Sequence, residues 1–337
     1  MKKVIIWFNH WFSTAYHMVN MIKDDNNTEF YIIGTNGNEE NVMKTVCDYW
    51  EKEPDFLSDE EYVQYCLEFC QRHSVNIFIP RKKQLSIVKN IKRFENISVK
   101  VLAEKNFEKM KQLNNKKNTY ELFKTLKIGN IPEYYIVNTA EKFIEAYQKL
   151  KANHKKICFK FVEDEGAVSF RIIDDSMKDA DIFLIRKGLK VTSEEVYNSL
   201  KKRKNTAEIM LMPYLEGEEV SVDCLKTKNG LISIPRVKTL TRTEIIRYDK
   251  EILDICKDFF KKYGVEHPCN IQFKYDNGIP YLLEINTRMS GGIHYTCLAA
   301  NINIPNISVN QLLGIDKIWK INKKETKVSY IETPILI

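Results

Sequence analysis

Short apolar runs alternate with stretches of helical periodicity over the first hundred residues of the chain. The strand-like runs are residues 2–8, 29–35, 75–80 and 98–103, and helical patterns occupy 14–22, 60–73 and 85–94 between them. This alternation is typical of parallel strands that are joined by crossover helices. We therefore predict a doubly wound, Rossmann-like α/β domain over residues 1–104.

The pattern changes in the middle of the chain, where helices and strands follow one another in mixed order. The expected elements are a helix at 106–126, a strand at 134–137, a helix at 139–151 and a strand at 156–161. Asn138 or Thr139 would cap the second helix, and Gly166 would form the bend of a hairpin. Mixed order predicts an α+β lobe over 105–190 in place of a continued parallel sheet.

The last segment is rich in strands. The expected strands are 207–215, 218–226, 231–240, 269–275, a run that begins at 279, and the tail 326–337, with one long helix at 244–264. The pair Asn277-Gly278 separates two alternating runs and is a strong hairpin signal. We predict a second α+β lobe over 191–337.

Composition narrows the class of protein. The chain has 337 residues, and its 44% hydrophobic content excludes intrinsic disorder. No window approaches the ~18 apolar residues of a membrane span, and no cleavage site follows the short apolar start, so we expect a cytoplasmic protein without a membrane partner. Lys and Arg outnumber Asp and Glu by 52 to 45, but they form no basic stripe of the kind that binds nucleic acid. The eight cysteines lack metal-ligand spacing, which favours reduced thiols in the core.

The loop after the first predicted strand lies where open parallel sheets bind ligands. It carries no GxGxxG pattern, which argues against a dinucleotide. His10 and Ser13 are candidate contacts in this loop, although a packed histidine and a capping serine are the favoured interpretation.

The hairpin near the C-terminus holds the most informative group of polar residues. Glu284 and Asn286 are two positions apart on one strand and so share a face, and Gln272 lies on the strand before the turn. Three oxygen-bearing side chains on an apolar hairpin suit a hard cation such as Mg²⁺. The alternative is an ordinary hairpin with these residues on its solvated face.

The string LLEINTRMSGG at 282–292 decides between these alternatives. Its Glu-x-Asn-x-Arg pattern resembles the terminal motif of the ATP-grasp superfamily of ligases. Because the first metal position is Gln272, the resemblance is closest to the carbamoyl-phosphate synthetase large-subunit type. The opening residues and the SGG ending also resemble the stand-alone biosynthetic branch that is linked to tellurite-resistance operons.

The resemblance implies a site as well as a fold. The fold would be a pre-ATP-grasp α/β domain followed by two lobes that clasp ATP. The implied cofactors are ATP and Mg²⁺, with Mn²⁺ as an alternative, and Arg288 would be catalytic. The metal ligands would be Gln272, Glu284 and Asn286, and the nucleotide would contact Lys116 (or its neighbour Lys117), Lys160, Met212, Tyr214, Leu215 and Glu219. The candidate substrate contacts are Arg236, Lys238, Gly291 and Gly292.

Two departures from the family pattern leave alternatives open. The loop that would cover the phosphates is poor in glycine and carries the acidic run 163–165, which would repel a triphosphate. Pro213 at the hinge removes a backbone donor, so a neighbouring N–H would have to bind adenine. The resemblance implies a ligase that joins a small-molecule carboxylate to an amine or another nucleophile. The resembled ligases are often dimers, so a homodimer is also expected. The alternatives are a weakened ATP-binding sensor or scaffold, and a small-molecule kinase.

Overall fold

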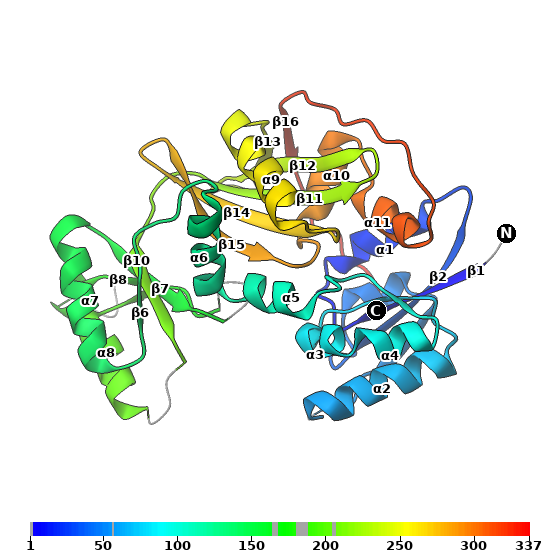
Figure 1. Cartoon of the computed structure of the whole chain (residues 1–337), viewed down its shortest axis with the longest axis horizontal. Helices are drawn as coiled ribbons and strands as arrows, with labels where there is room; N and C mark the ends of the chain where they lie inside the picture. The colour runs from blue at the N-terminus through cyan, green and yellow to red at the C-terminus, as the bar shows by residue number, and fades with distance from the viewer. Residues whose placement is uncertain (1–2, 56, 164–167, 180–187, 204–206) are drawn as a thin grey trace. The chain divides into compact units, whose positions relative to one another are not determined.

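A computed structural model describes residues 3–55, 57–163, 168–179, 188–203 and 207–337 of the chain (Figure 1). The chain forms two compact units, each built from separated segments. Unit 1 comprises residues 1–113, 219–272 and 285–337, and unit 2 comprises 114–218 and 273–284. The boundary between the units therefore cuts twice through one hairpin. The predicted division at residues 104 and 190 stays a prediction.

The first sheet of unit 1 confirms the predicted doubly wound α/β arrangement. Five parallel strands lie in the order β3-β2-β1-β4-β5. They are β1 (Lys3–Asn9), β2 (Glu29–Asn36), β3 (Tyr49–Lys52), β4 (Ile77–Ile79) and β5 (Lys100–Val101). The connecting helices are α1 (Ala15–Lys23), 3₁₀ helix η1 (Val42–Val46), α2 (Asp59–Arg72), α3 (Gln84–Lys89) and α4 (Ile91–Asn96). Strand β3 is polar and was not predicted, because its sequence YWEK lacks an apolar run.

Strand β1 shows how alternation builds two cores. Trp7 belongs to the core cluster on one face, where it stacks on Phe69 and Phe78 with 4.2 Å between ring centroids. Ile6 and Phe8 point to the other face and join a second cluster. Successive side chains of a strand point to opposite faces, so a strand buried on both sides reads as a continuous apolar run.

The second sheet has six strands in the order β15-β14-β11-β12-β13-β16. The strands are β11 (Glu219–Thr227), β12 (Gly230–Lys238), β13 (Thr243–Ile246), β14 (Cys269–Asp276), β15 (Ile279–Asn286) and β16 (Thr326–Ser329). The associated helices are α9 (Lys250–Tyr263), α10 (Ile293–Ala300) and α11 (Ile304–Leu312). The predicted turn is confirmed, since Asn277 and Gly278 have φ of 48° and 79°.

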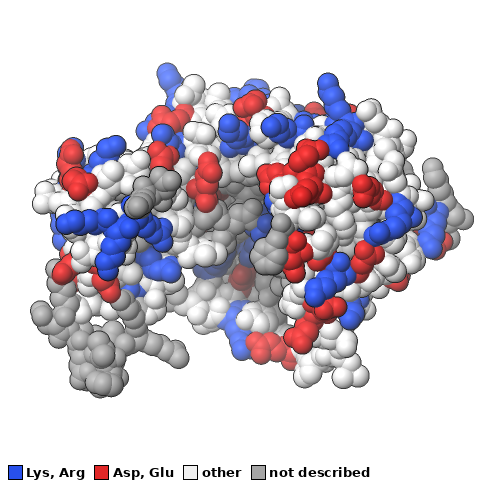
Figure 2. Space-filling model, turned by 90° about the horizontal axis from the view of Figure 1, so that it is seen from below, with Lys and Arg blue, Asp and Glu red and all other residues white. Residues whose placement is uncertain are grey.

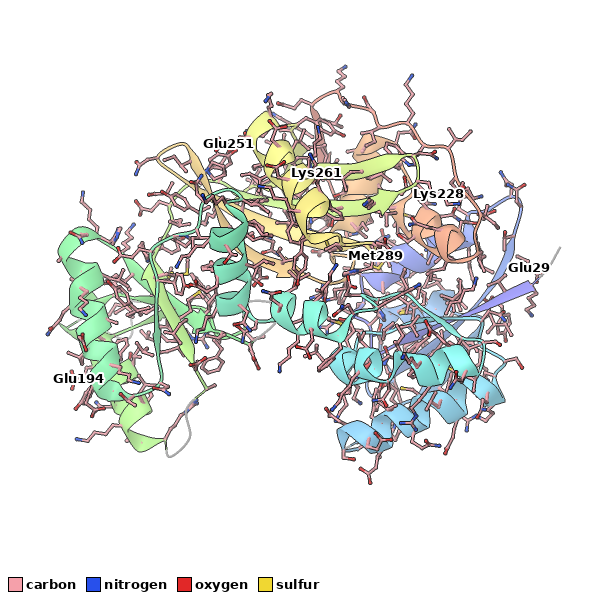
Figure 3. The ribbon with its side chains drawn as sticks, viewed as in Figure 1. Glu29, Glu194, Lys228, Glu251, Lys261 and Met289 are labelled. Carbon is pink, nitrogen blue, oxygen red and sulfur yellow. The ribbon has the colours of Figure 1, made fainter. Side chains whose placement is uncertain are left out.

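Two predictions for this sheet need correction. The helix predicted at 244–264 begins only at Lys250, because the Asp249 side chain caps it and the preceding residues pair with β12 as strand β13. Glu251 and Lys261 lie in the first and last turns of that helix (Figure 3), where each charge suits the helix dipole. The predicted closing strand covers only Thr326–Ser329, at the sheet edge.

Unit 2 contains a five-stranded mixed sheet in the order β6-β10-β7-β8-β9. Its strands are β6 (Tyr135–Val137), β7 (Ile157–Phe161), β8 (Arg171–Ile173), β9 (Lys190–Val191) and β10 (Ile209–Pro213). Its helices are α6 (Lys116–Leu126), α7 (Ala140–Asn153), 3₁₀ helix η2 (Asp175–Asp179) and α8 (Ser193–Lys202), while α5 (Phe107–Asn114) ends at the unit boundary. This confirms the predicted α+β order.

The helix caps and turns of unit 2 can be compared with the elements predicted for residues 105–190. Thr139 caps α7, because its hydroxyl accepts the N–H of Lys142. The helix predicted at 106–126 is two helices, which are separated by the cap residue Asn115. Strands β7 and β8 pair antiparallel as predicted, and the bend at Gly166 lies outside the described residues.

Helix length, the cysteines and the surface charges of the described residues bear on the predictions made from composition. No helix among them is long and apolar enough to cross a membrane. Cys47 is half-buried and the other seven thiols are buried and free, as expected for reduced core cysteines. On the face seen in Figure 2, basic and acidic side chains are intermixed.

Candidate functional site

Two buried lysines of unit 2 converge on the end of strand β15. Lys116 opens α6 and is 4% exposed, and its Nζ lies 3.7 Å from Oε2 of Glu284. Lys160 on β7 is 9% exposed, and its Nζ donates to the carbonyl of Leu283 at 2.8 Å. The Tyr120 hydroxyl donates to the same carbonyl at 3.1 Å. Buried cations need anionic or oxygen partners, so this group is a ready place for phosphate oxygens.

Local structure fixes Lys116 at this place. The Asn115 side chain caps α6 by accepting the N–H of Asn118 at 3.0 Å, and the N–H of Lys116 donates to the carbonyl of Val162. The Asn115 amide also donates to Glu163 at 2.8 Å. Glu163 is exposed, and the rest of the acidic run lies outside the described residues. Lys117, the alternative to Lys116, is only half-buried.

The backbone N–H groups after strand β10, in the predicted hinge, differ in their hydrogen bonding. The N–H of Tyr214 donates to the carbonyl of Lys156 at 2.9 Å and continues the ladder between β10 and β7. It is therefore occupied, and Pro213 has no N–H. Among the described residues, the N–H of Leu215 has no acceptor. The free hinge donor is thus Leu215, while Met212 is buried within the strand.

Glu219 and Lys238 face each other across strands β11 and β12 and form an ion pair. Both side chains are partly exposed, at 28% and 38%. The predicted ribose contact and one predicted substrate contact therefore neighbour each other, and each neutralises the charge of the other.

The predicted metal residues lie in the middle of β14 (Gln272) and at the end of β15 (Glu284 and Asn286). Gln272 and Asn286 belong to unit 1 and Glu284 to unit 2, and all three are half-buried. The Nε2 amide of Gln272 donates to Oδ1 of Asn270 at 3.3 Å, which leaves Oε1 of Gln272 as the atom that could bind a cation. In the described part of the chain, no group of three or more His, Cys, Asp or Glu could hold a metal. The predicted set instead combines one carboxylate with two amide oxygens.

Arg236 was predicted as a substrate contact on a strand face, and the structure instead buries it to 3% exposure. Its Nε donates to the hydroxyl of Thr296 at 3.2 Å, and Nη2 donates to those of Ser221 and Ser290 at 3.3 and 3.4 Å. Nη1 forms an ion pair with Glu244. With its donors engaged by the protein, Arg236 holds the loop after β15 against the sheet.

Neighbouring side chains lie very close to the two glycines of this loop, Gly291 and Gly292. A Cβ at Gly292 would lie 2.6 Å from the guanidinium of Arg236, so the loop can cover the arginine only without a side chain there. A Cβ at Gly291 would lie 3.3 Å from the hydroxyl of Thr14. Met289, in the same loop and labelled in Figure 3, is buried in the core of unit 1.

Residues from the N-terminal sheet of unit 1 meet the loop after β15. The guanidinium of Arg288 lies 5.5 Å from the ring centroid of Phe12. His17 stacks on His294 with centroids 4.1 Å apart and planes 16° from parallel. Burial lowers the pKa of His294 to about 4, and His17 and Arg236 add to the effect.

The sequence prediction missed the buried polar residues beneath this loop. The hydroxyl of Thr296 donates to Oδ2 of Asp223 at 2.6 Å, and the amide of Asn270 donates to Oδ1 of Asp223 at 2.9 Å. Ser221 accepts a second hydrogen bond from Asn270 at 2.9 Å. The alternation of Ser221 and Asp223 with valines in VSVD was a signal that could have found them. The Tyr120 hydroxyl had no such signal.

Two sequence comparisons match parts of the chain. Residues 205–334 match the family model described as ATP-grasp in the biosynthetic pathway with Ter operon. The chain is 25% identical over 253 residues to the carbamoyl phosphate synthase large chain of Clostridium botulinum. That match covers 64% of this chain and 23% of the relative, so the chain spans about a quarter of the relative's length.

Solved structures share the fold at low identity. N5-carboxyaminoimidazole synthetase from Staphylococcus aureus, complexed with ADP, has a TM-score of 0.70 at 13% identity, covering 97% of this chain and 82% of that one. A biotin carboxylase–ATP complex from Campylobacter jejuni also gives 0.70 at 13% identity, covering 94% and 72%. The biotin carboxylase domain of Hydrogenobacter thermophilus 2-oxoglutarate carboxylase, a dimer with MgADP and bicarbonate, gives 0.69 at 14% identity, covering 94% and 71%.

Proposed function

We propose that this chain is an ATP-grasp protein and an ATP-dependent ligase, because it is similar to an ATP-grasp family model and to the carbamoyl phosphate synthase large chain. ATP would phosphorylate a substrate carboxylate to an acyl phosphate and leave as ADP. An amine would then attack the acyl carbon and release phosphate. The observation that carries this proposal is the convergence of buried Lys116 and Lys160 on the strand end that carries Glu284.

The predicted site residues take distinct roles in this proposal. Lys116 and Lys160 would neutralise phosphate oxygens, because phosphoryl transfer depends mainly on positioning and charge stabilisation. Gln272, Glu284 and Asn286 would hold Mg²⁺, which neutralises charge on the terminal phosphates.

The hinge and the loop after β15 complete the set. The carbonyl of Pro213 and the N–H of Leu215 would bind the amine and the ring nitrogen at the adenine edge, which present a donor and an acceptor. Glu219 would bind the ribose hydroxyls. Arg288 would stabilise charge on the transferring group, in a loop that Arg236 holds in place.

The neighbouring structures support the cofactor part of the proposal. Structures with the same fold hold ADP, MgADP or an ATP complex, and one also holds bicarbonate. Those ligands belong to those proteins, and for this chain they make ATP with Mg²⁺ the first cofactors to supply.

Hydroxylamine trapping tests the proposal. The protein is incubated with Mg·ATP, pooled small carboxylates and hydroxylamine, and both ADP and hydroxamate are measured, because hydroxylamine intercepts acyl phosphates. We expect hydroxamate in equal amount to ADP. A stable phosphoester without hydroxamate would identify a kinase, and ATP-dependent thermal stabilisation without ADP would identify a binder.

Paired variants test the residue assignment in the same assay. Lys116→Met and Glu284→Ala should each lower hydroxamate formation at least ~100-fold, as when a key electrostatic group is removed from a transition state. Lys117→Met is the matched control and should retain the wild-type rate. Equal loss in the Lys116 and Lys117 variants would contradict the phosphate assignment.

A further inference from the structure

A second polar cluster lies at the carboxyl edge of the parallel sheet in unit 1. The side chain of Glu53, just after β3, is completely buried, although it is a carboxylate. It accepts hydrogen bonds from the hydroxyls of Thr35 on β2 at 2.8 Å and of Tyr62 on α2 at 3.0 Å. His10 follows β1 and Lys82 follows β4, so four neighbouring strands supply this cluster.

Two nitrogen atoms face one oxygen of Glu53. Lys82 Nζ lies 3.3 Å and His10 Nδ1 lies 3.5 Å from Oε2. Burial alone would raise the pKa of Glu53, but the contacts with His10, Thr35 and Lys82 hold it below the ordinary value. An ionised Glu53 directs the N–H of His10 Nδ1 inward, which leaves the lone pair of Nε2 on the other side of the ring.

The backbone of His10 has a left-handed conformation that few residues other than glycine adopt. Its φ is 50°, and its N–H donates to the carbonyl of Thr35 at 2.7 Å. The preceding Asn9 is fully buried and accepts the N–H of Arg81 at 2.6 Å. The imidazole is nevertheless 44% exposed. A left-handed backbone and a buried carboxylate each cost free energy of folding. A histidine without a function would not require either of them.

The position of this histidine fits a ligand site. In the order β3-β2-β1-β4-β5, the strands β2 and β3 are added on one side of β1, and β4 and β5 are added on the other side. Ligands of open α/β sheets bind at the point between β1 and β4 where the strand order reverses. A Cβ at Gly37 would lie 3.4 Å from Oδ1 of Asp55 and 3.7 Å from Cε1 of His10, so both residues border this glycine. Lys82 pairs with the buried Glu53, and the exposed Asp55 is a carboxylate near this edge that can attract a cationic ligand.

The same loop also contacts the segment that follows β15. Two residues beyond His10, Phe12 lies under the guanidinium of Arg288, and Thr14 lies against Gly291. One short loop therefore joins the histidine to the segment that carries the proposed catalytic arginine.

We propose that the amine substrate binds at this edge as an ammonium ion, and that His10, positioned by Glu53, accepts its proton through Nε2. This inference rests on the proposed ligase function. Loss of that proton gives the free amine, whose lone pair forms the C–N bond as the C–O bond to phosphate breaks. The second N–H proton leaves with the phosphate as hydrogen phosphate, and the proton on His10 passes to water.

The test compares two nucleophiles for the same acyl phosphate. The full-length protein is given Mg·ATP and pooled carboxylates with either hydroxylamine or a pool of amino acids and polyamines. Hydroxylamine is largely uncharged at neutral pH and needs no base, whereas the pooled amines are protonated. We use His10→Asn, because asparagine tolerates a left-handed backbone. His154→Gln is the control, because His154 also lies beside a carboxylate, Glu133, at 3.0 Å but outside this cluster.

The readout is the ratio of hydroxamate to amide. His10→Asn should raise this ratio about 100-fold, the usual contribution of a general base, and its amide rate should recover as pH rises and free amine accumulates. Glu53→Gln should raise the ratio in the same direction and shift the pH profile. An unchanged ratio in His10→Asn would overturn the inference while hydroxamate formation still supported the ligase.

Two further outcomes are informative. Hydroxamate without amide from any pooled amine would overturn the amine assignment. A wild-type protein that forms no hydroxamate would contradict the ligase function itself, which distinguishes that failure from failure of the histidine assignment.

Discussion

At the scale of single residues, the contacts of Arg236 favour a role in positioning the loop after β15. Its guanidinium is buried against Ser221, Glu244, Ser290 and Thr296, and the sequence alone could not show this because a strand arginine is usually solvated. The Glu-x-Asn-x-Arg string predicts a site in the segment 284–288, and that assignment stays a prediction. The string carries no information on which side chains of distant strands and helices surround a given cation.

Replacing Gly292 tests this positioning role. In Gly292→Ala the new methyl carbon would lie 2.6 Å from the guanidinium of Arg236, so the loop or the arginine must move. We expect a loss of about 1–3 kcal/mol in the free energy of unfolding, as for other overpacked sites, together with a lower ligase rate. Chemical denaturation measures the first quantity.

Gly37→Ala is the matched control for that change. Its added methyl would meet its nearest neighbours only at 3.4 and 3.7 Å, which are ordinary contact distances. Equal stability of the two variants would show that the close approach at Gly292 is not a constraint.

The stacked histidines predict a pH dependence of stability. The pKa of His294 falls from an ordinary 6.5 to about 4 on folding, chiefly by burial. Between these values the unfolded chain binds more protons than the folded one, so stability decreases as pH falls from 6.5 to 4. Thermal melts across this window should show a shallower decrease for His294→Asn than for the wild type, and parallel curves would refute the assignment.

At the scale of elements, most helices and strands followed from periodicity, and the exceptions have local causes. The predicted helix 106–126 is broken because Asn115 caps a new helix, and the start of the predicted helix 244–264 becomes edge strand β13 because it pairs with β12. A periodic pattern cannot show where a side chain captures a backbone N–H. That choice depends on neighbours distant in sequence.

The Asn115 cap gives a prediction at this scale. Asn115→Ala removes the hydrogen bond from Asn118 and should cost about 1 kcal/mol of stability. Because Lys116 is the first residue of the capped helix, the KM for ATP should also rise. Asn138→Ala, beside the observed Thr139 cap, is the control and should leave the KM for ATP unchanged. A destabilised Asn115→Ala protein with an unchanged KM would separate the cap from the nucleotide site.

At the scale of the whole molecule, the chain order obscures the division into units. Unit 2 takes up residues 114–218 and then 273–284, so one hairpin contributes to both units. The sequence indicated an α/β domain followed by α+β segments, and this class is confirmed by the fold that the solved structures share. The unit boundary passes through a hairpin, and no change in composition along the chain marks it. The sequence therefore contains no signal for this division.

If ATP activates a carboxylate, one oxygen atom of that carboxylate is transferred to phosphate. The protein is supplied with Mg·ATP, pooled amines and pooled carboxylates labelled with ¹⁸O in both carboxyl oxygens, and the released phosphate is analysed by mass spectrometry. An acyl phosphate that is attacked at carbon keeps one carboxylate oxygen on phosphorus. The account predicts one ¹⁸O atom in each phosphate released, and ATP turnover that yields only unlabelled phosphate would contradict it.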